Sequence, residues 1–490
     1  MATSTRSPRR SWDAPVPPIF RPLLRAYLIG YASAVGPRFL SLLIQYTLRR
    51  QKKERETNGN GKKRKDSFLV ALQRVLLRPM ETQSFPTFCA ALVGGYTFLE
   101  LPLKSIIDRN GSNISELARK RLSRFLASFI SAWMSLQLLQ SKQTPDFTGT
   151  TPHPHPSKPP VTTHFAGRTL DLTLLAATRA LDVIVGELWA RRRTRREAAG
   201  HWTRWDARIG RLADPALFAF SSGLVMWTWF YEPARLPPAY QRWISTAAAV
   251  DNRLITALQR CRDGTLRYGR DTGQAPLLGS MCDDYLWPRH WGDPAVSIPF
   301  PCEIVHMGVG PSCEHHALSR FTRSFTWAMT TYLPLSLLLA LRSRGPRSLL
   351  TSPPALRRVL LSAARSSAFL GAFITFFYYG VCLARTRIGP HIVGTSTPCR
   401  QRLDGGICVG TGCFLCGWSI LLEHAGRRKD IALFVAPRAL ATLVPRKYGK
   451  EKEWRETAVF ATSVAVVLTV FAENRRRVRG VMGGVLNGVF

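Results

Sequence analysis

The stretch "SSAFLGAFITFFYYGVCLA", residues 366–384, decides the fold of this chain. It holds no charged residue and consists mainly of aromatic, aliphatic and small side chains. A helix needs roughly 17 to 25 such residues to cross the hydrocarbon core of a membrane. A buried helix of a soluble protein can look the same, so the rest of the chain has to separate the two interpretations.

Other apolar windows of similar length recur along the chain. They cover residues 85–103, 125–141, 215–231, 324–341, 405–422 and 457–472, and only the first is interrupted by a charge, Glu100. One window alone is compatible with a soluble core, whereas this many favour a membrane bundle. We predict an all-α fold: a multi-pass helical membrane protein with about seven to ten membrane-associated helices and a small membrane-proximal helical cap.

The charge of the chain is strongly positive. Lys and Arg outnumber Asp and Glu by 68 to 31, which gives a net charge of +37. The run "RRQKKERETNGNGKKRKD" (49–66) could attract nucleic acid or anionic lipid headgroups. Basic clusters such as Arg191–Arg196 and Arg475–Arg479 directly adjoin apolar windows, where headgroups lie. We therefore expect membrane lipids with anionic headgroups as partners, and no nucleic acid.

Composition divides the chain into six stretches. We expect a flexible N-terminal tail (1–21), N-terminal membrane helices with a basic loop at 49–66 (22–140), a linker rich in Pro, Thr and His (141–166), further membrane helices (167–231), a membrane-proximal cap containing a Cys-His motif (232–322) and a C-terminal membrane helical bundle (323–490). The linker is too polar and too rich in proline to build a core of its own. Within the cap, residues 242–264 have amphipathic helical spacing.

Three ionisable residues of the mostly apolar helical stretch 167–190 are candidate site residues. Asp171 and Asp182 are three helical turns apart and share a face, and Arg179 lies three residues before Asp182. Charges inside a membrane helix are costly and usually paired. The three residues are candidates for an intramembrane polar site, or for an ion pair that only fixes the helix in place.

Glycines at a spacing of four mark candidate helix contacts. Gly480, Gly484 and Gly488 form a stripe near the C-terminus, and Gly406 and Gly410 form a shorter one. Such stripes let another helix approach closely. They predict helix packing within the chain or in a homo- or hetero-oligomer.

The cap ends in "PCEIVHMGVGPSCEHH" (301–316), which contains candidate metal ligands. Zinc binds four nitrogen or sulfur ligands, and Cys302, His306 and Cys313, completed by one of the two following histidines, could supply them. A disulfide between the two cysteines would need an oxidising compartment. The Gly-Pro segment between them could also be simply a turn that leads into the next helix. The spacing leaves the zinc site, the disulfide and the simple turn open as alternatives. We expect no cofactor.

The same residues resemble a known family. "EIVHMGVGPSC" (303–313), followed by "FTWAMTTYLPLSLLLAL" (325–341), resembles the Cys-His motif and following helix of the transmembrane protein 135 family, also called peroxisomal membrane protein 52. "WSILLEHAGRRKDIALFVAPRALATLVPR" (418–446) is similar to a further segment of that family, and the C-terminal helices are similar too. The resemblance covers roughly residues 300–490, and the earlier part looks like a fungal-type form.

The resemblance implies a membrane protein of peroxisomes or, second, of mitochondria, associated with lipid handling and organelle dynamics. It brings no catalytic residues. In animal members the first cysteine of the motif stands one residue further from the histidine, which favours a cap leading into a membrane helix over a rigid ligand set.

Two functions follow from these patterns. The first is a non-enzymatic integral membrane protein that supports lipid handling or organelle membrane organisation. The alternative is a transporter or channel that uses Asp171, Arg179 and Asp182. The chain contains no GxSxG, P-loop or HExxH motif, so we expect no enzyme.

Overall fold

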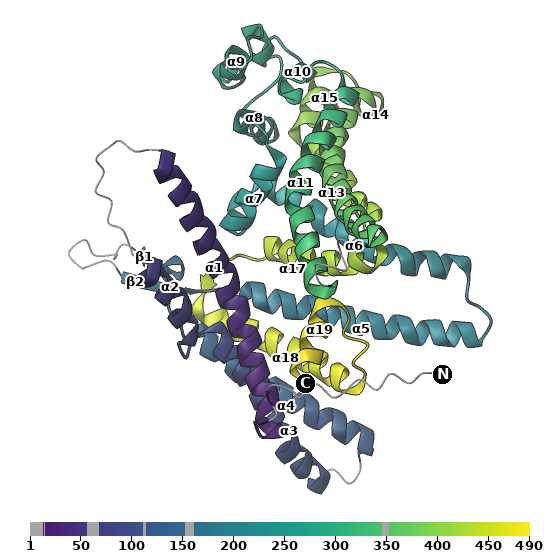
Figure 1. Ribbon diagram of the computed structural model, residues 1–490. Helices are drawn as coiled ribbons and strands as arrows, with labels where there is room; N and C mark the ends of the chain where they lie inside the picture. The colour runs from purple at the N-terminus through teal and green to yellow at the C-terminus, as the bar shows by residue number, and fades with distance from the viewer. Residues whose placement is uncertain (1–12, 14, 56–67, 111–113, 152–160, 345–351) are drawn as a thin grey trace. The chain divides into compact units, whose positions relative to one another are not determined.

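The computed structural model describes residues 13, 15–55, 68–110, 114–151, 161–344 and 352–490 (Figure 1). The described residues are helical apart from turns and one small sheet, which confirms the all-α class. They form two compact units: unit 1 combines residues 1–195 with 446–490, and unit 2 comprises residues 196–445.

Six described helical segments are long and apolar enough to cross a membrane. They are Phe68–Asn110, Glu116–Gln140, Cys313–Arg342, Pro353–Arg387, Thr397–Leu422 and Lys450–Glu473. The opening stretch, 366–384, lies inside the fourth. The apolar window at 215–231 belongs to helix α6 (Arg204–Tyr231), which is not among the six because its Trp, Ser and Tyr residues dilute the aliphatic ones.

Unit 1 is a helical bundle with a small sheet. Its helices are α1 (Arg21–Arg55), α2 (Phe68–Leu77), α3 (Phe85–Asn110), α4 (Glu116–Gln140), α5 (Leu170–Ala198), α18 (Glu453–Glu473) and α19 (Gly480–Val489). Helix α4 packs on α3 and α18. Ala127, Ala132 and Ala461 are completely buried, so small side chains let these helices approach closely.

The segment predicted as a linker rich in Pro, Thr and His, 141–166, contains two strands. β1 (Thr148–Thr151) pairs antiparallel with β2 (Val161–Ala166), and β2 pairs with β3 (Tyr448–Gly449). Threonine and valine favour strands, and pairing with β3 gives the segment the partner that its own sequence does not reveal. This sheet joins the two parts of the chain that make up unit 1.

A buried carboxylate holds the sheet to the helices of unit 1. Glu456 of α18 is 6% exposed and accepts hydrogen bonds from the hydroxyl groups of Thr169, Thr173 and Tyr448. Burial, followed by the bond to Glu456, raises the pKa of Tyr448. A buried carboxylate needs several donors, and here they come from two separate segments, the start of α5 and the strand β3.

The basic loop predicted at 49–66 is partly helical. Helix α1 continues through Arg55, so the first part of the basic run extends that helix. The remainder of the run lies outside the described residues, as do most residues of the predicted N-terminal tail.

Unit 2 is built around one extended apolar core. Besides α6, its helices are α7 (Pro238–Ala248), α8 (Asn252–Asp263), α9 (Ala275–Asp284), α10 (Cys302–His306), α11 (Cys313–Arg344), α13 (Pro353–Cys382), α14 (Gly389–Val393), α15 (Thr397–Arg402), α16 (Cys408–Cys416) and α17 (Ala425–Leu443). Helices α11 and α13 lie side by side over most of their length (Figure 1). The cap consists of helices α7 to α10. Residues 307–312 connect its last helix, α10, to the start of α11.

The helix predicted at 242–264 is broken in two. Helix α7 stops at Ala248 because Ala249 takes the left-handed conformation, with φ 47°. Helix α8 then starts behind Asp251, whose carboxylate accepts a hydrogen bond from the backbone N–H of Arg253 at 2.8 Å. Such N-terminal caps contribute about 1 kcal/mol. The break lets the cap fold back on itself.

Glycines do allow a close helix crossing in unit 2, but at positions the sequence analysis missed. A Cβ atom on Gly380 of α13 would lie 2.8 Å from the Cα atom of Gly412 on α16. A Cβ atom on Gly412 would lie 2.6 Å from the carbonyl oxygen of Phe377. The two helices can cross this closely only because both positions lack a side chain.

Candidate functional site

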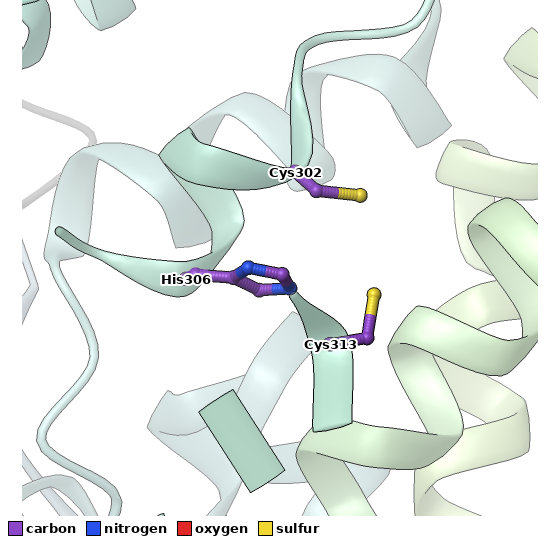
Figure 2. A group of neighbouring side chains, drawn as sticks. All are labelled: Cys302, His306 and Cys313. Atoms are coloured by element: carbon purple, nitrogen blue, oxygen red, sulfur yellow. The ribbon is translucent and has the colours of Figure 1, made fainter. Parts of the chain in front are cut away.

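The structure brings together the three residues singled out as metal ligands. The ligand atoms of Cys302, His306 and Cys313 all lie within 4.8 Å of one another. Figure 2 shows both sulfur atoms on the same side of the His306 ring. His306 and Cys313 are buried and Cys302 is half-buried, so the cluster is largely shielded from water.

Local backbone geometry creates this cluster. Cys302 and His306 are one turn apart on α10, and therefore share a face. The helix stops at Met307, which has φ 51°, and Gly308 and Gly310 also have positive φ values. These left-handed residues turn the chain back so that Cys313, the first residue of α11, faces α10.

A fourth group, Cys382, reaches the cluster from the end of α13. Its sulfur atom lies 3.4 Å from Nε2 of His306. Sequence analysis missed this residue because it is far along the chain and sits inside an apolar window, where a cysteine is an ordinary packing residue. The close pairing of α11 with α13 places it here.

The two histidines considered as the fourth ligand have other environments. His315 is exposed, and its Nδ1 lies 3.2 Å from the carbonyl oxygen of Val309. His316 is buried and stacks on His306 with 4.5 Å between ring centroids. Neither ring nitrogen of His316 has a hydrogen-bond partner among the described residues. Its ring therefore supports His306 from one side.

Burial sets the protonation of the two cap residues of the cluster. It raises the pKa of the Cys302 thiol to about 11. It also lowers the pKa of His306, which favours a neutral imidazole at neutral pH. Nδ1 of His306 lies 2.6 Å from the carbonyl oxygen of Gly310, so Nδ1 carries the hydrogen and donates it. The unprotonated lone pair is then on Nε2, the nitrogen that faces Cys382.

A buried ion pair lies next to the cluster. Arg385 of the segment after α13 contacts both carboxylate oxygens of Asp404, and it also donates to the carbonyl oxygen of Phe300 at 3.1 Å. The hydroxyl of Tyr268 donates to the same carboxylate. The network ties the cap to the end of α13.

The polar residues of α5 differ in their exposure. Asp171 is exposed and pairs with Arg446 at 2.8 Å, whereas Arg179 is buried and Asp182 is half-buried. Helix α5 is not among the six segments that could cross a membrane. That the three residues form an intramembrane site stays a prediction.

The glycine stripes also differ in their surroundings. Gly484 and Gly488 are exposed, and a Cβ atom on either would meet nothing within 4 Å among the described residues. Gly480 has φ 71° and starts α19. Gly406 and Gly410 lie beside the side chain of Trp227 of α6. The use of these glycines for packing stays a prediction.

A basic cleft of about 1050 Å³ opens beside Gly406 and Gly410. Four arginines line it: Arg262, Arg267, Arg270 and Arg402. The guanidinium of Arg262 lies over the rings of Trp227 and Tyr231, 4.6 and 4.5 Å from their centroids. Exposed guanidinium groups of this kind bind phosphate and carboxylate groups.

Unit 2 also contains an apolar cavity of about 570 Å³. Residues of α6, α7, α11, α13 and α17 line it, among them Phe218, Trp243, Ile244, Phe373, Phe377 and Phe434. The walls are mostly aromatic and aliphatic. Asp430 supplies a polar group, and its buried Oδ1 has no hydrogen-bond partner among the described residues. A cavity of this size and lining is typical of a site for a small apolar ligand.

In comparisons with known proteins, no family model, no curated protein and no solved structure matches this chain.

Proposed function

We propose that this protein is a non-enzymatic, multi-pass membrane protein that binds a lipid in the apolar cavity of unit 2. The cavity is the observation that carries the proposal. Helices α11 and α13, which contribute to its wall, are among the segments that could cross a membrane. A lipid from the surrounding bilayer is therefore the apolar molecule that such a cavity would meet at the highest concentration.

The polar group in the cavity indicates which kind of lipid would bind. Oδ1 of Asp430 is buried without a donor, and an unpaired buried acceptor is costly. A lipid with a hydroxyl group at one end, such as a sterol or a monoacylglycerol, would donate to it. Its hydrocarbon part would lie against Phe373, Phe377 and Phe434.

The basic cleft supports the expected preference for anionic headgroups. Its four exposed arginines carry charge without a carboxylate among the lining residues. Anionic headgroups attract such clusters by about 1 kcal/mol per basic side chain near the membrane surface. The cleft would hold the protein on an anionic leaflet while the cavity binds the lipid.

The proposal also includes the organelle in whose membrane the protein lies. The resemblance of residues 300–490 to the transmembrane protein 135 family supports a peroxisomal membrane first and a mitochondrial membrane second. It also supports a role in lipid handling or membrane organisation, with no catalytic step.

Lipid binding is tested with the full chain purified in detergent and a photoactivatable cholesterol probe. Ala247 lines the cavity and is half-buried, so Ala247→Trp should fill part of the space. The matched control is Thr246→Trp, on the exposed face of the same helix. We expect labelled peptides from α7 and α13 in the wild type, about tenfold less labelling in Ala247→Trp, and wild-type labelling in the control.

The probe is repeated with a photoactivatable monoacylglycerol. Labelling of the cavity peptides by either probe supports the proposal and tells the two lipid classes apart. Equal labelling of the Ala247→Trp and Thr246→Trp variants, or no labelling of cavity peptides by either probe, would contradict it.

A further inference from the structure

Three cysteine side chains lie close to His306. Two of them, Cys302 and Cys313, come with His306 from the short segment 302–313, and the third, Cys382, ends α13, the helix that packs against α11. The sulfur of Cys382 is 3.4 Å from Nε2 of His306. The ligand atoms of Cys302, His306 and Cys313 lie within 4.8 Å of one another, and the Cys382 sulfur joins this group through its contact with His306.

The geometry points to a structural zinc site with Cys302, His306, Cys313 and Cys382 as its four ligands. Zinc in structural sites is tetrahedral, and three cysteines with one histidine are among its usual ligand sets. Neither the resemblance nor the spacing of the motif includes Cys382. The site is independent of the lipid-binding proposal.

The observed distances are compatible with such a centre. Zn–S bonds of about 2.3 Å and Zn–N bonds of about 2.0 Å at tetrahedral angles put sulfur and nitrogen about 3.5 Å apart and two sulfur atoms about 3.8 Å apart. The separation of 3.4 Å between Cys382 and His306 is close to the sulfur-to-nitrogen value. The other three ligand atoms lie within 4.8 Å of one another. Cys382 is not part of that group, so its side chain and the other thiols have to turn toward the ion when it binds.

The imidazole of His306 is already oriented for a metal. Its Nδ1–H donates to the carbonyl oxygen of Gly310 at 2.6 Å, which leaves the Nε2 lone pair directed at the thiols. A backbone carbonyl that fixes the tautomer in this way is the usual outer partner of a zinc-bound histidine. Stacking on His316 holds the ring from the side.

A nearby arginine, Arg385, would balance the charge of the zinc centre. Binding of Zn²⁺ displaces the three thiol protons to solvent and leaves a centre with one net negative charge. Arg385 follows Cys382 by one helical turn, is 2% exposed, and acts electrostatically on Cys302. Its Nη1 has no hydrogen-bond partner among the described residues, so a donor remains free for a thiolate. A buried cation with a free donor is expected beside a negatively charged thiolate centre.

A zinc ion here would fasten the cap to the bundle. Cys302 and His306 belong to α10, Cys313 begins α11, and Cys382 ends α13. The metal would fix the turn between α10 and α11 against the end of α13. Two cysteines alone, as in a disulfide, would leave α13 unattached.

The test uses the full chain purified in detergent and reductant, stripped of metal and then loaded with Zn²⁺ or Co²⁺. We expect one zinc ion per chain by elemental mass spectrometry, and cobalt absorption typical of tetrahedral thiolate ligands. Cys382→Ser should weaken zinc binding by more than about tenfold. The matched control, Cys416→Ser, removes another buried cysteine of unit 2 outside the cluster and should keep full binding.

Zinc X-ray absorption of the wild type tests the ligand set without any variant. Three sulfur atoms and one nitrogen bound to the zinc support the site, whereas only two sulfur atoms would contradict a set of three cysteine ligands and overturn it. Failure of the wild type to retain zinc, equal binding by Cys382→Ser and the wild type, or a disulfide between Cys302 and Cys313 in the native protein would also overturn it.

Discussion

Arg385 and Asp404 form a bidentate ion pair inside unit 2, with Nε to Oδ1 at 2.6 Å and Nη2 to Oδ2 at 2.8 Å. Both side chains are 2% exposed or less. The pair joins the end of α13 to the segment before α16. Because Arg385 also bonds to Phe300 and Asp404 to Tyr268, the cap and the bundle share one buried network.

Removing one partner of this pair should be strongly destabilising. Asp404→Ala leaves the guanidinium of Arg385 buried without its counter-charge, and we expect a loss of about 3–5 kcal/mol. The measurement is thermal unfolding of the detergent-purified protein. Glu314→Gln, which breaks the exposed pair between Glu314 and Arg387, is the control and should leave the midpoint nearly unchanged. Equal shifts in the two variants would contradict the importance of the buried pair.

The close crossing of α13 and α16 should reject even a methyl group. A Cβ atom at Gly412 would overlap the backbone of α13, so we expect Gly412→Ala to cost about 1–3 kcal/mol. Gly484→Ala meets open space among the described residues and is the matched control. If Gly484→Ala lowers the unfolding midpoint as much as Gly412→Ala, then α19 packs on another helix through its glycines, as the sequence stripe predicts.

Acid should weaken the start of α8. Hydrogen bonds from the Arg253 guanidinium lower the pKa of Asp251, so the folded state holds this carboxylate ionised more firmly than the unfolded state does. Its contribution is fully present above the unfolded pKa of about 3.9 and is lost as the pH falls through the lower, folded value. Asp251→Asn keeps a capping side chain but cannot ionise. Unfolding midpoints between pH 5 and 3 should therefore fall more steeply in the wild type than in the variant, and parallel curves would refute the linkage.

Substitution of the polar residues of α5 distinguishes lipid binding from the alternative function, transport. Because Asp171 pairs with Arg446 at an exposed position, we expect Asp171→Asn combined with Asp182→Asn to leave ion and small-solute flux unchanged. Ion and small-solute flux is measured in proteoliposomes of wild type and variant. Flux in the wild type that disappears in the variant at normal abundance would support the transporter or channel instead.

One experiment tests both whether the protein is integrated in a membrane and in which organelle it lies. The tagged protein is followed across separated peroxisomes and mitochondria, each extracted with alkaline carbonate. We expect it to stay in the peroxisomal membrane pellet, because six described helical segments are long and apolar enough to span. Release into the supernatant would show that these helices pack in a soluble core or lie on the membrane surface.

Much of the fold could be predicted from local pattern. Charge-free windows such as 366–384 become long helices because an apolar run of this length has few other stable conformations. The sequence also marked Cys302, His306 and Cys313, whose proximity follows from one helical turn and two left-handed glycines. Interactions within about a dozen residues are visible in sequence because local geometry fixes them.

Residues far apart in the chain were decided by tertiary structure alone. Cys382 reaches His306, Asp404 pairs with Arg385, and Gly380 meets Gly412 only because α13 packs against α11 and α16. The strand at Tyr448 likewise gives the polar linker a partner that composition could not reveal. The apolar windows by themselves determined that helices form. Which helices meet, and hence which side chains surround the cysteine cluster and the cavity, depends on complementary surfaces that no single segment encodes.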